Sequence, residues 1–276
     1  MLIADSISRI LEHVGLRAST FYAGPLCGLH DFAADQGVGH LHVFRSGETR
    51  VIQKGQQDIF VSEPTLLFYP APLDHRLDIK DSAVADVLCA IVRYNIGVEN
   101  AITQSFPSVI IIPFNALKRI DLTLTTLFAE AEESNLGKQV MLDRLCDILL
   151  IQIVRFVIEQ KMVSSGILAG LAHPRLSKLL VELLENPDQN WTLDTMAART
   201  NRSRNAFATE FRNVVGSTAT DFLTSVRITL AQRLLRRRRP IALVAEAVGY
   251  SSQPAFSRAF IRELGMSPSE WVRQEK

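Results

Sequence analysis

Two short segments near the carboxyl end of the chain carry the side chains whose types and spacing could do chemistry. They are Ser203–Gly216 and Ser252–Gly265, and the second repeats the first with a shift of 49 residues. Both contain amide, hydroxyl or guanidinium groups that can hydrogen-bond to base edges in DNA, as Gln does to adenine and Arg does to guanine. The candidates for reading bases are Arg204, Asn205, Thr209, Gln253, Ser257 and Arg258.

Three further arginines are predicted to contact the DNA backbone rather than the bases. A guanidinium beside the groove neutralises a phosphate, which strengthens binding in a salt-dependent way but carries no sequence information. The candidates for phosphate contact are Arg212, Arg227 and Arg262.

Short helices are the elements that must position these groups. In the second copy the apolar residues of 241–248 recur at helical spacing, and Gly249 suits a left-handed helix end. Either Ser251 or Ser252 can cap the following helix. Phe256 and Phe260 are four residues apart and therefore share the inner face of that helix. The first copy follows the same pattern, with Asn201 at its turn. Each copy is therefore predicted to be a helix-turn-helix, whose second helix can enter the major groove.

A helical bundle whose second copy merely faces solvent is the alternative interpretation. Two copies in a fixed register favour a duplicated motif over this alternative. Between them, 219–238 is predicted to form one long helix with an apolar side. Such a helix would hold the two motifs rigidly apart.

The last hundred residues resemble the AraC/XylS family of bacterial transcription regulators. The second copy carries the family signature in 245–251, in 256–260 and in 265–268. The first copy departs from it, because 199–201 and 218–222 differ from the usual residues. The resemblance implies a cytoplasmic regulator that is not an enzyme and binds double-stranded DNA as a homodimer. It also implies contact with RNA polymerase and a small-molecule effector, and it favours activation.

The charge distribution agrees with a DNA-binding carboxyl-terminal half. The whole chain has a formal net charge of +1. Residues 1–172 contain 14 Lys and Arg against 19 Asp and Glu, whereas 173–276 contain 16 against 10. The positive half is the one expected to meet a polyanion.

The amino-terminal half is predicted to be a β-rich domain after a first helix at 3–16. Short runs rich in strand-forming residues alternate with Gly, Pro, Asp and Asn, which is typical of a sandwich or small barrel. The predicted strands are Leu41–Arg45, Thr49–Gln53, Asp58–Val61, Thr65–Tyr69, Arg76–Ile79 and Asp86–Tyr94. The fold class is therefore α+β, with a β domain followed by an all-α domain.

The spacing of His40, His42, Glu48 and His75 resembles the cupin barrel pattern. In cupin enzymes three histidines and a glutamate bind a transition metal, and these ligand types suit iron, manganese, nickel or zinc. Three interpretations remain open: a metal site, a pocket for an organic effector, and ordinary strand histidines. We expect no cofactor. The corresponding functional alternative is a metal-dependent cupin enzyme fused to a DNA-binding module.

Two helices are predicted between the β-rich region and the carboxyl-terminal domain, at 117–133 and 140–161. The second is apolar over most of its circumference and must be buried on more than one side. The family resemblance implies that it also contributes to a dimer. The predicted division is 1–112 for the cupin-like sensor, 113–170 for the helical dimerisation segment and linker, and 171–276 for the DNA-binding domain. An amino-terminal domain that only dimerises is a further alternative.

Other features of the sequence limit the possible functions. Cys27, Cys89 and Cys146 are widely spaced, which indicates free thiols in a reducing compartment rather than a disulfide framework or zinc site. The first residues lack a signal-peptide layout, and the apolar runs are too short to span a membrane. No phosphate-binding loop, Gly-x-Ser-x-Gly or His-Glu-x-x-His motif occurs. The sequence contains no convincing catalytic constellation.

Overall fold

The computed structural model describes residues 15–34, 38–80, 83–94, 103, 105–117, 120–163 and 165–274. The chain divides into two compact units. One contains Gly15–Tyr94 with Phe106–Val163, and the other contains Ser164–Lys276. The predicted helix at 3–16 falls almost entirely on residues 1–14, which lie outside the described part.

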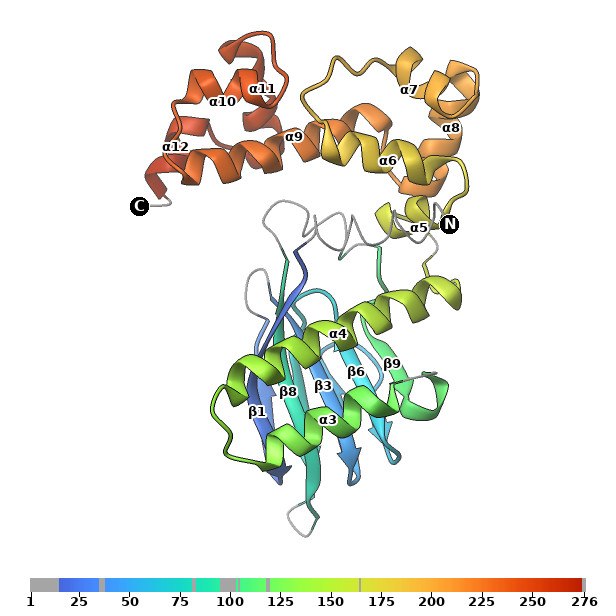
Figure 1. Ribbon diagram of the computed structural model, residues 1–276, viewed down its shortest axis with the longest axis vertical. Coiled ribbons are helices and arrows are strands. Elements are labelled where there is room, and N and C mark those ends of the chain that lie inside the picture. The colour runs from blue at the N-terminus through green and yellow to red at the C-terminus, as the bar shows by residue number, and fades with distance from the viewer. Residues whose placement is uncertain are drawn as a thin grey trace. The chain divides into compact units, whose positions relative to one another are not determined.

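The amino-terminal unit is built from two antiparallel sheets (Figure 1). The five-stranded sheet has the order β1 (Arg17–Leu26), β8 (Ala85–Arg93), β3 (Val38–Ser46), β6 (Thr65–Tyr69), β9 (Ile110–Pro113). The four-stranded sheet has the order β2 (Gly28–Phe32), β7 (His75–Ile79), β4 (Thr49–Gln53), β5 (Ile59–Val61). Only Cys27 separates β1 from β2, so the chain changes sheets at that residue.

The core of this unit lies between the facing sheets. In β4, Thr49, Val51 and Gln53 are buried while the residues between them are more accessible, because successive side chains of a strand point to opposite faces. All five residues of β6 are buried, because its sheet is covered on both faces. The six predicted strands are confirmed to within a few residues. β1, β2 and β9 were not predicted.

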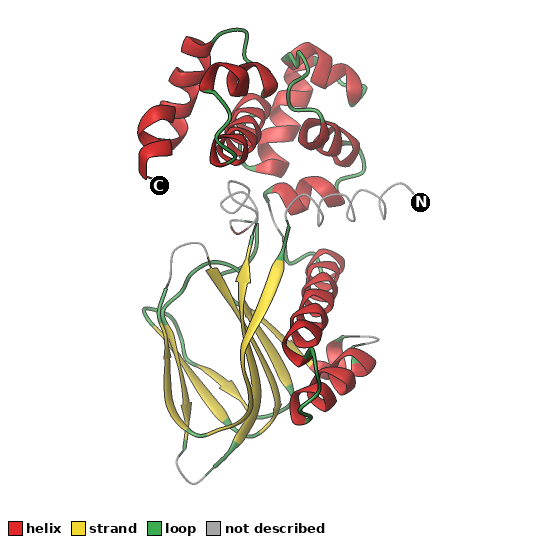
Figure 2. Cartoon of the chain, turned by 60° about the vertical axis from the view of Figure 1, so that its left-hand side comes forward, coloured by secondary structure: helices red, strands yellow, loops and turns green. Residues whose placement is uncertain are grey.

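Two helices, α3 (Asp121–Glu132) and α4 (Lys138–Glu159), cover the outer face of the five-stranded sheet (Figures 1 and 2). A single 3-10 turn, η1 (Phe114–Ala116), precedes them. The Asp147 carboxylate accepts a 2.8 Å hydrogen bond from the Ala18 amide, and that of Asp143 accepts one of 2.7 Å from the Thr20 amide. These bonds attach α4 to β1. Both helices were predicted from their apolar periodicity, and the structure confirms them.

The carboxyl-terminal unit is entirely helical in its described part. Its helices are α5 (Ile167–Ala172), α6 (Leu176–Glu185), α7 (Leu193–Arg199), α8 (Arg204–Val215), α9 (Ala219–Arg236), α10 (Ile241–Ala247), α11 (Gln253–Leu264) and α12 (Pro268–Gln274). The sequence suggested a linker up to residue 170, but α5 begins at Ile167 and buries Ile167, Leu168 and Leu171. Gly170 permits this packing, because a Cβ there would lie 2.5 Å from Leu180 Cδ1.

No helix in the part of the chain that the structure describes is long and apolar enough to cross a membrane.

Candidate nucleic-acid interface

The two predicted helix-turn-helix motifs are α7 with α8 and α10 with α11. Their turns use a residue with positive φ, which is 53° at Asn201 and 84° at Gly249. Each second helix then begins at a capping serine. The Ser203 and Ser252 hydroxyls each accept a 3.4 Å hydrogen bond from the amide three residues later. The predicted turns and caps are confirmed in both copies.

The inner faces of the two motifs are equivalent. Phe207, Phe211, Phe256 and Phe260 are completely buried. The ring centroids of the first pair are 5.6 Å apart, and those of the second are 5.5 Å apart. These rings are core residues, as predicted, and they are not available to stack on bases.

The predicted base-reading side chains lie mainly on the outer faces of α8 and α11. Arg204, Asn205 and Thr209 are exposed on α8, and Gln253 and Arg258 are exposed on α11. Ser257 is half-buried. Arg204 makes an ion pair of 3.6 Å with Asp194, another exposed residue. The structure therefore presents hydrogen-bonding groups to solvent at both second helices.

Asn213 and Arg202 belong to the same surface as Asn205 and Thr209, although sequence reasoning missed them. All four line a shallow hollow of about 640 Å³ along α8. The 49-residue shift could have identified Asn213, because it places that residue opposite Arg262, a predicted phosphate contact.

The three predicted phosphate contacts do not share one environment. Arg212 and Arg262 are exposed, in the last turns of α8 and α11. Arg227 is half-buried on α9, and its guanidinium donates to the carbonyl oxygens of Pro187 and Gln189, at 2.7 and 2.8 Å. The phosphate role of Arg227 stays a prediction, but its side chain is already engaged within the protein.

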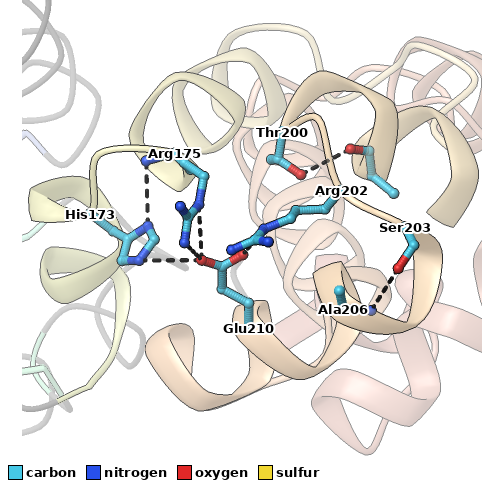
Figure 3. A network of polar contacts seen from close by, with 8 residues as sticks. His173, Arg175, Thr200, Arg202, Ser203, Ala206 and Glu210 are labelled. Carbon is cyan, nitrogen blue, oxygen red and sulfur yellow. Dashed lines mark hydrogen bonds and ion pairs between the residues drawn. The ribbon is translucent and has the colours of Figure 1, made fainter.

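A group of ion pairs surrounds Glu210 on the flank of α8 (Figure 3). Its carboxylate accepts hydrogen bonds from Arg175, of 2.6 Å from Nη2 and 3.2 Å from Nε. Arg202 Nε lies 3.3 Å from the second oxygen, and His173 Nε2 lies 3.5 Å from the first. The hydrogen bond from Arg175 holds the pKa of Glu210 below its usual range. These contacts connect α8 to the segment that precedes α6.

Sequence reasoning could not have found this cluster by comparing the two copies. The 49-residue shift places Ala259 opposite Glu210, so the second motif has no equivalent carboxylate. The shortest contact, from Arg175, joins residues 35 positions apart, which local periodicity does not show.

Comparison with known families agrees with both halves of the fold. A cupin family model matches residues 5–159, which is more than half of the chain, and a helix-turn-helix domain model matches residues 196–274. The RCS-specific HTH-type transcriptional activator RclR of Escherichia coli K12 is 28% identical over 98% of this chain and 99% of its own length. The chain belongs to the AraC/XylS family of transcription regulators.

Other relatives match a smaller share of the chain. The HTH-type transcriptional regulator AlkR of Acinetobacter baylyi is 36% identical over 52% of this chain and 48% of its own length. The DNA-binding domain of AdpA, solved with a target DNA, is 31% identical over 37% of this chain and 93% of that chain, with a TM-score of 0.36. RclR and AlkR are named as transcription regulators, and neither family match indicates an enzyme.

In the cupin unit of this AraC/XylS regulator, His42 and His75 form the middle of a hydrogen-bonded chain that runs from the Cys89 thiol to the Leu73 carbonyl oxygen. The His75 Nδ1 atom lies 2.7 Å from the Leu73 carbonyl oxygen, so this nitrogen carries the proton and donates. The two Nε2 atoms are 2.8 Å apart. His42 must donate that bond, and its Nδ1 can then accept from the Cys89 thiol at 3.1 Å. One set of neutral tautomers thus satisfies every nitrogen of both rings.

The pKa shifts agree with neutral rings and a neutral thiol. Burial lowers the pKa of His42 well below its usual range, with a further contribution from His75. Burial also lowers the pKa of His75 to about 4 and raises the pKa of the Cys89 thiol. Rings without charge suit this interior, because an unpaired imidazolium would be desolvated there.

These residues do not fit a cupin metal site. Every ring nitrogen of His42 and His75 already has a partner, as described above. Glu48 is exposed in the turn after β3, whereas His40 lies near the start of that strand. Within the described ranges no group of three or more His, Cys, Asp or Glu side chains is arranged to hold a metal ion. The structure therefore brings His40, His42 and His75 together, with ring centroids 5.0 to 6.1 Å apart, but leaves the exposed Glu48 outside this buried cluster.

A pocket of about 320 Å³ opens beside the histidines. It is lined by Asp31, Phe32, Ala33, Ile52, Lys54, Asp74, His75 and Arg76. The Phe32 ring stacks on His75, with centroids 5.1 Å apart and planes inclined by 8°, and it lies edge-to-face with His42, with centroids 4.7 Å apart. Phe32 thus lines the pocket and also packs against the histidine chain.

Proposed function

We propose that the regulator reads double-stranded DNA with α8 and α11 together. The observation that supports this proposal is the repeated geometry of the two helices, each with a capped start, a buried phenylalanine pair and an exposed polar face. The long helix α9 joins the two motifs. Two such helices could enter successive major grooves on one face of B-DNA, which are about 34 Å apart.

Within this proposal, the base-reading groups are Arg204, Asn205, Thr209, Gln253, Ser257 and Arg258. Arg258 is the strongest candidate, because an exposed guanidinium in the middle of an inserted helix can form two hydrogen bonds with guanine. Arg212 and Arg262 are assigned to phosphates. Asn213 joins them as a candidate because of its position in the repeat.

The test compares Arg258→Ala with Arg262→Ala on a duplex selected by the wild-type protein from a random-sequence library. Loss of Arg258 should weaken binding to the selected duplex by about 1–3 kcal/mol and affect random DNA much less. Loss of Arg262 should weaken both and reduce the slope of log affinity against log salt by about 0.9. An equal loss on random DNA for Arg258→Ala would refute the base-reading assignment. Failure to select any duplex would refute the DNA-binding proposal itself.

The pocket beside His75 supports a second part of the proposal, namely that a small organic effector binds the cupin unit. Its volume of about 320 Å³ suits a small molecule, and it combines an aromatic wall with charged groups at Lys54 and Asp74. An effector could change DNA binding only if it bound the DNA-competent arrangement with a different affinity. Filling the pocket with Ile52→Trp should abolish the response to any effector found by screening, while DNA binding without the effector is retained.

We further propose that the protein acts as a homodimer in the cytoplasm and activates transcription through RNA polymerase. The relative RclR is named a transcriptional activator. Met141 and Ile148 are exposed seven residues apart on α4, so they share one apolar face that could contact a second copy. Sedimentation of Ile148→Glu should show a loss of dimer if this face is the contact, and an unchanged mass would place the contact elsewhere.

A further inference from the structure

The turn of the second helix-turn-helix motif touches the loop that leads into the first motif, in addition to the connection through α9. The loop that leads from α6 to α7 approaches the turn between α10 and α11. A Cβ on Gly249 would lie 2.7 Å from both the Cα and the carbonyl oxygen of Asp188. Only glycine permits so close an approach, since real Cβ atoms do not come this near to backbone atoms. The turn of the second motif therefore packs against the loop that enters the first.

Arg227 lies at this junction and contacts both sides of it. Its Nε donates to the Pro187 carbonyl at 2.7 Å, and its Nη2 donates to the Gln189 carbonyl at 2.8 Å. On the other side, the guanidinium carbon lies 5.5 Å from the ring centroid of Tyr250, within the range of a cation–π contact. The side chain thus joins the middle of α9 to the first motif and to the second.

Each side of the junction continues toward a DNA-facing helix. The Tyr250 ring packs on Phe256, with centroids 5.6 Å apart, and Phe256 lies on the inner face of α11. On the first side, Trp191 donates from Nε1 to the Asn186 carbonyl at 2.8 Å, which fixes the loop just before α7. A displacement of the junction would therefore move both motifs relative to α9.

We propose that Arg227 is a positioning residue that sets the orientation of the two motifs relative to each other. The inference rests on the proposed function, because it concerns binding to a site that both motifs contact. A single helix fixes the distance between two motifs but leaves each attached at one side only. The contacts of Arg227 at the junction provide a second connection between the two motifs, so the two DNA-facing helices already have a fixed relative orientation before they bind DNA.

The geometry favours this role over the predicted phosphate contact. Two of the guanidinium nitrogens are bound to carbonyl oxygens, and the side chain is half-buried, unlike Arg212 and Arg262. Lysine could keep the charge, but it has neither the planar group with two parallel donors nor the same stacking on Tyr250. A charge-only role and a positioning role therefore predict different behaviour for Arg227→Lys.

The test uses three kinds of DNA. The first is the duplex selected by the wild-type protein. The second is a pair of half-site duplexes, in each of which the bases contacted by one of the two motifs are randomised. The third is a set of duplexes in which the spacing between the two half sites is changed by one base pair. Two linked modules commonly bind about 10²–10⁴ more tightly than a single module. We expect Arg227→Ala to reduce the affinity for the intact duplex roughly tenfold, because part of this gain is lost. Half-site affinity and the salt slope should stay as in the wild type. The penalty for moving the half sites should become smaller, because the motifs are no longer held in one orientation.

Arg227→Lys should behave like Arg227→Ala, and Arg237→Ala should behave like the wild type, since Arg237 is exposed at the end of the same helix. If Arg227→Ala does not fold, Gly249→Ala and Arg227→Lys are the substitute variants, because each disrupts the junction at a different residue. Both should reduce the affinity for the intact duplex and leave the half-site affinity unchanged. Equal losses on intact and half-site duplexes, with a reduced salt slope and recovery in Arg227→Lys, would overturn the proposal in favour of a phosphate contact. Unchanged affinity for the intact duplex would also overturn it. Failure of the wild type to bind any selected duplex would instead refute the proposed function.

Discussion

Replacing Glu210 with glutamine should destabilise the carboxyl-terminal unit at neutral pH and leave its fold intact. Glutamine has nearly the same shape, but it removes the negative charge that Arg175 and Arg202 share. The effect should depend on pH, because Glu210 has a folded-state pKa below its usual range. Its stabilising contribution is present above the unfolded-state pKa of about 4.3 and is lost as the pH falls through the folded-state value.

The expected size follows from burial and geometry. The Glu210 side chain is 14% exposed, which favours the upper part of the range for a hydrogen bond to a charged group, about 1.5–3 kcal/mol. Its partners Arg175 and Arg202 are 48% and 40% exposed, however, and exposed ion pairs contribute only about 0–1 kcal/mol. We therefore expect Glu210→Gln to lower the free energy of unfolding by about 1–2 kcal/mol at neutral pH.

The chain offers a selective assay. Its two tryptophans, Trp191 and Trp271, both lie in the carboxyl-terminal unit, so tryptophan fluorescence during urea unfolding reports that unit in the full-length protein. Glu246→Gln is the matched control, since Glu246 is exposed on α10 and should change stability by less than about 0.5 kcal/mol. The difference between Glu210→Gln and the wild type should shrink at acidic pH.

Two results would refute this reasoning. If Glu210→Gln unfolded at the same urea concentration as Glu246→Gln, the ion pairs around Glu210 would not stabilise the unit. If the difference were equally large below the folded-state pKa, its cause would be packing rather than charge.

Two further predictions concern the interior of each unit. Phe256→Ala should lower the stability of the carboxyl-terminal unit by about 3–5 kcal/mol, because it removes a completely buried ring, and urea unfolding followed by tryptophan fluorescence measures this. A loss below 1 kcal/mol would contradict its place in the core. The stability of the amino-terminal unit should be full above about pH 6.5 and should fall as the pH approaches the folded-state pKa of His75, about 4, because only the unfolded chain takes up the proton. Calorimetry of His75→Asn should show a weaker dependence on pH, and an unchanged dependence would assign the effect to other groups.

The helix-turn-helix motifs could be predicted from sequence because their determinants are local. A capping serine, a turn residue and two phenylalanines four apart define each motif within a few positions. The strands β1 and β2 escaped prediction because Gly24 and Pro25 interrupt the first, and the second, Gly-Leu-His-Asp-Phe, contains few strand-forming residues. Their conformation depends on pairing with β8 and β7, which are far away in the sequence.

The residues around the sites were predicted less completely than the motifs. His40 and His42 share a strand face because alternate residues do so, and the face-to-face packing of the two sheets brings His75 of β7 near them. Glu48 fitted a spacing pattern, but it follows the end of β3 and remains exposed. The roles of Glu210 and Arg227 depend on partners 35 to 40 residues away, and sequence periodicity shows nothing of such contacts.

The close approach at Gly249 makes the two copies of the duplicated motif unequal. Asn201 and Gly249 occupy corresponding turn positions and both adopt positive φ, but only the second has the Asp188 backbone against its Cα. An exchange of turn sequences between the copies would therefore be one-directional. Glycine would be accepted at the first turn, whereas asparagine at the second would collide with the loop that leads into the first motif. The second turn is thus restricted to glycine by its contact with the loop that leads into the first motif, although both copies share the same caps and buried phenylalanine pairs.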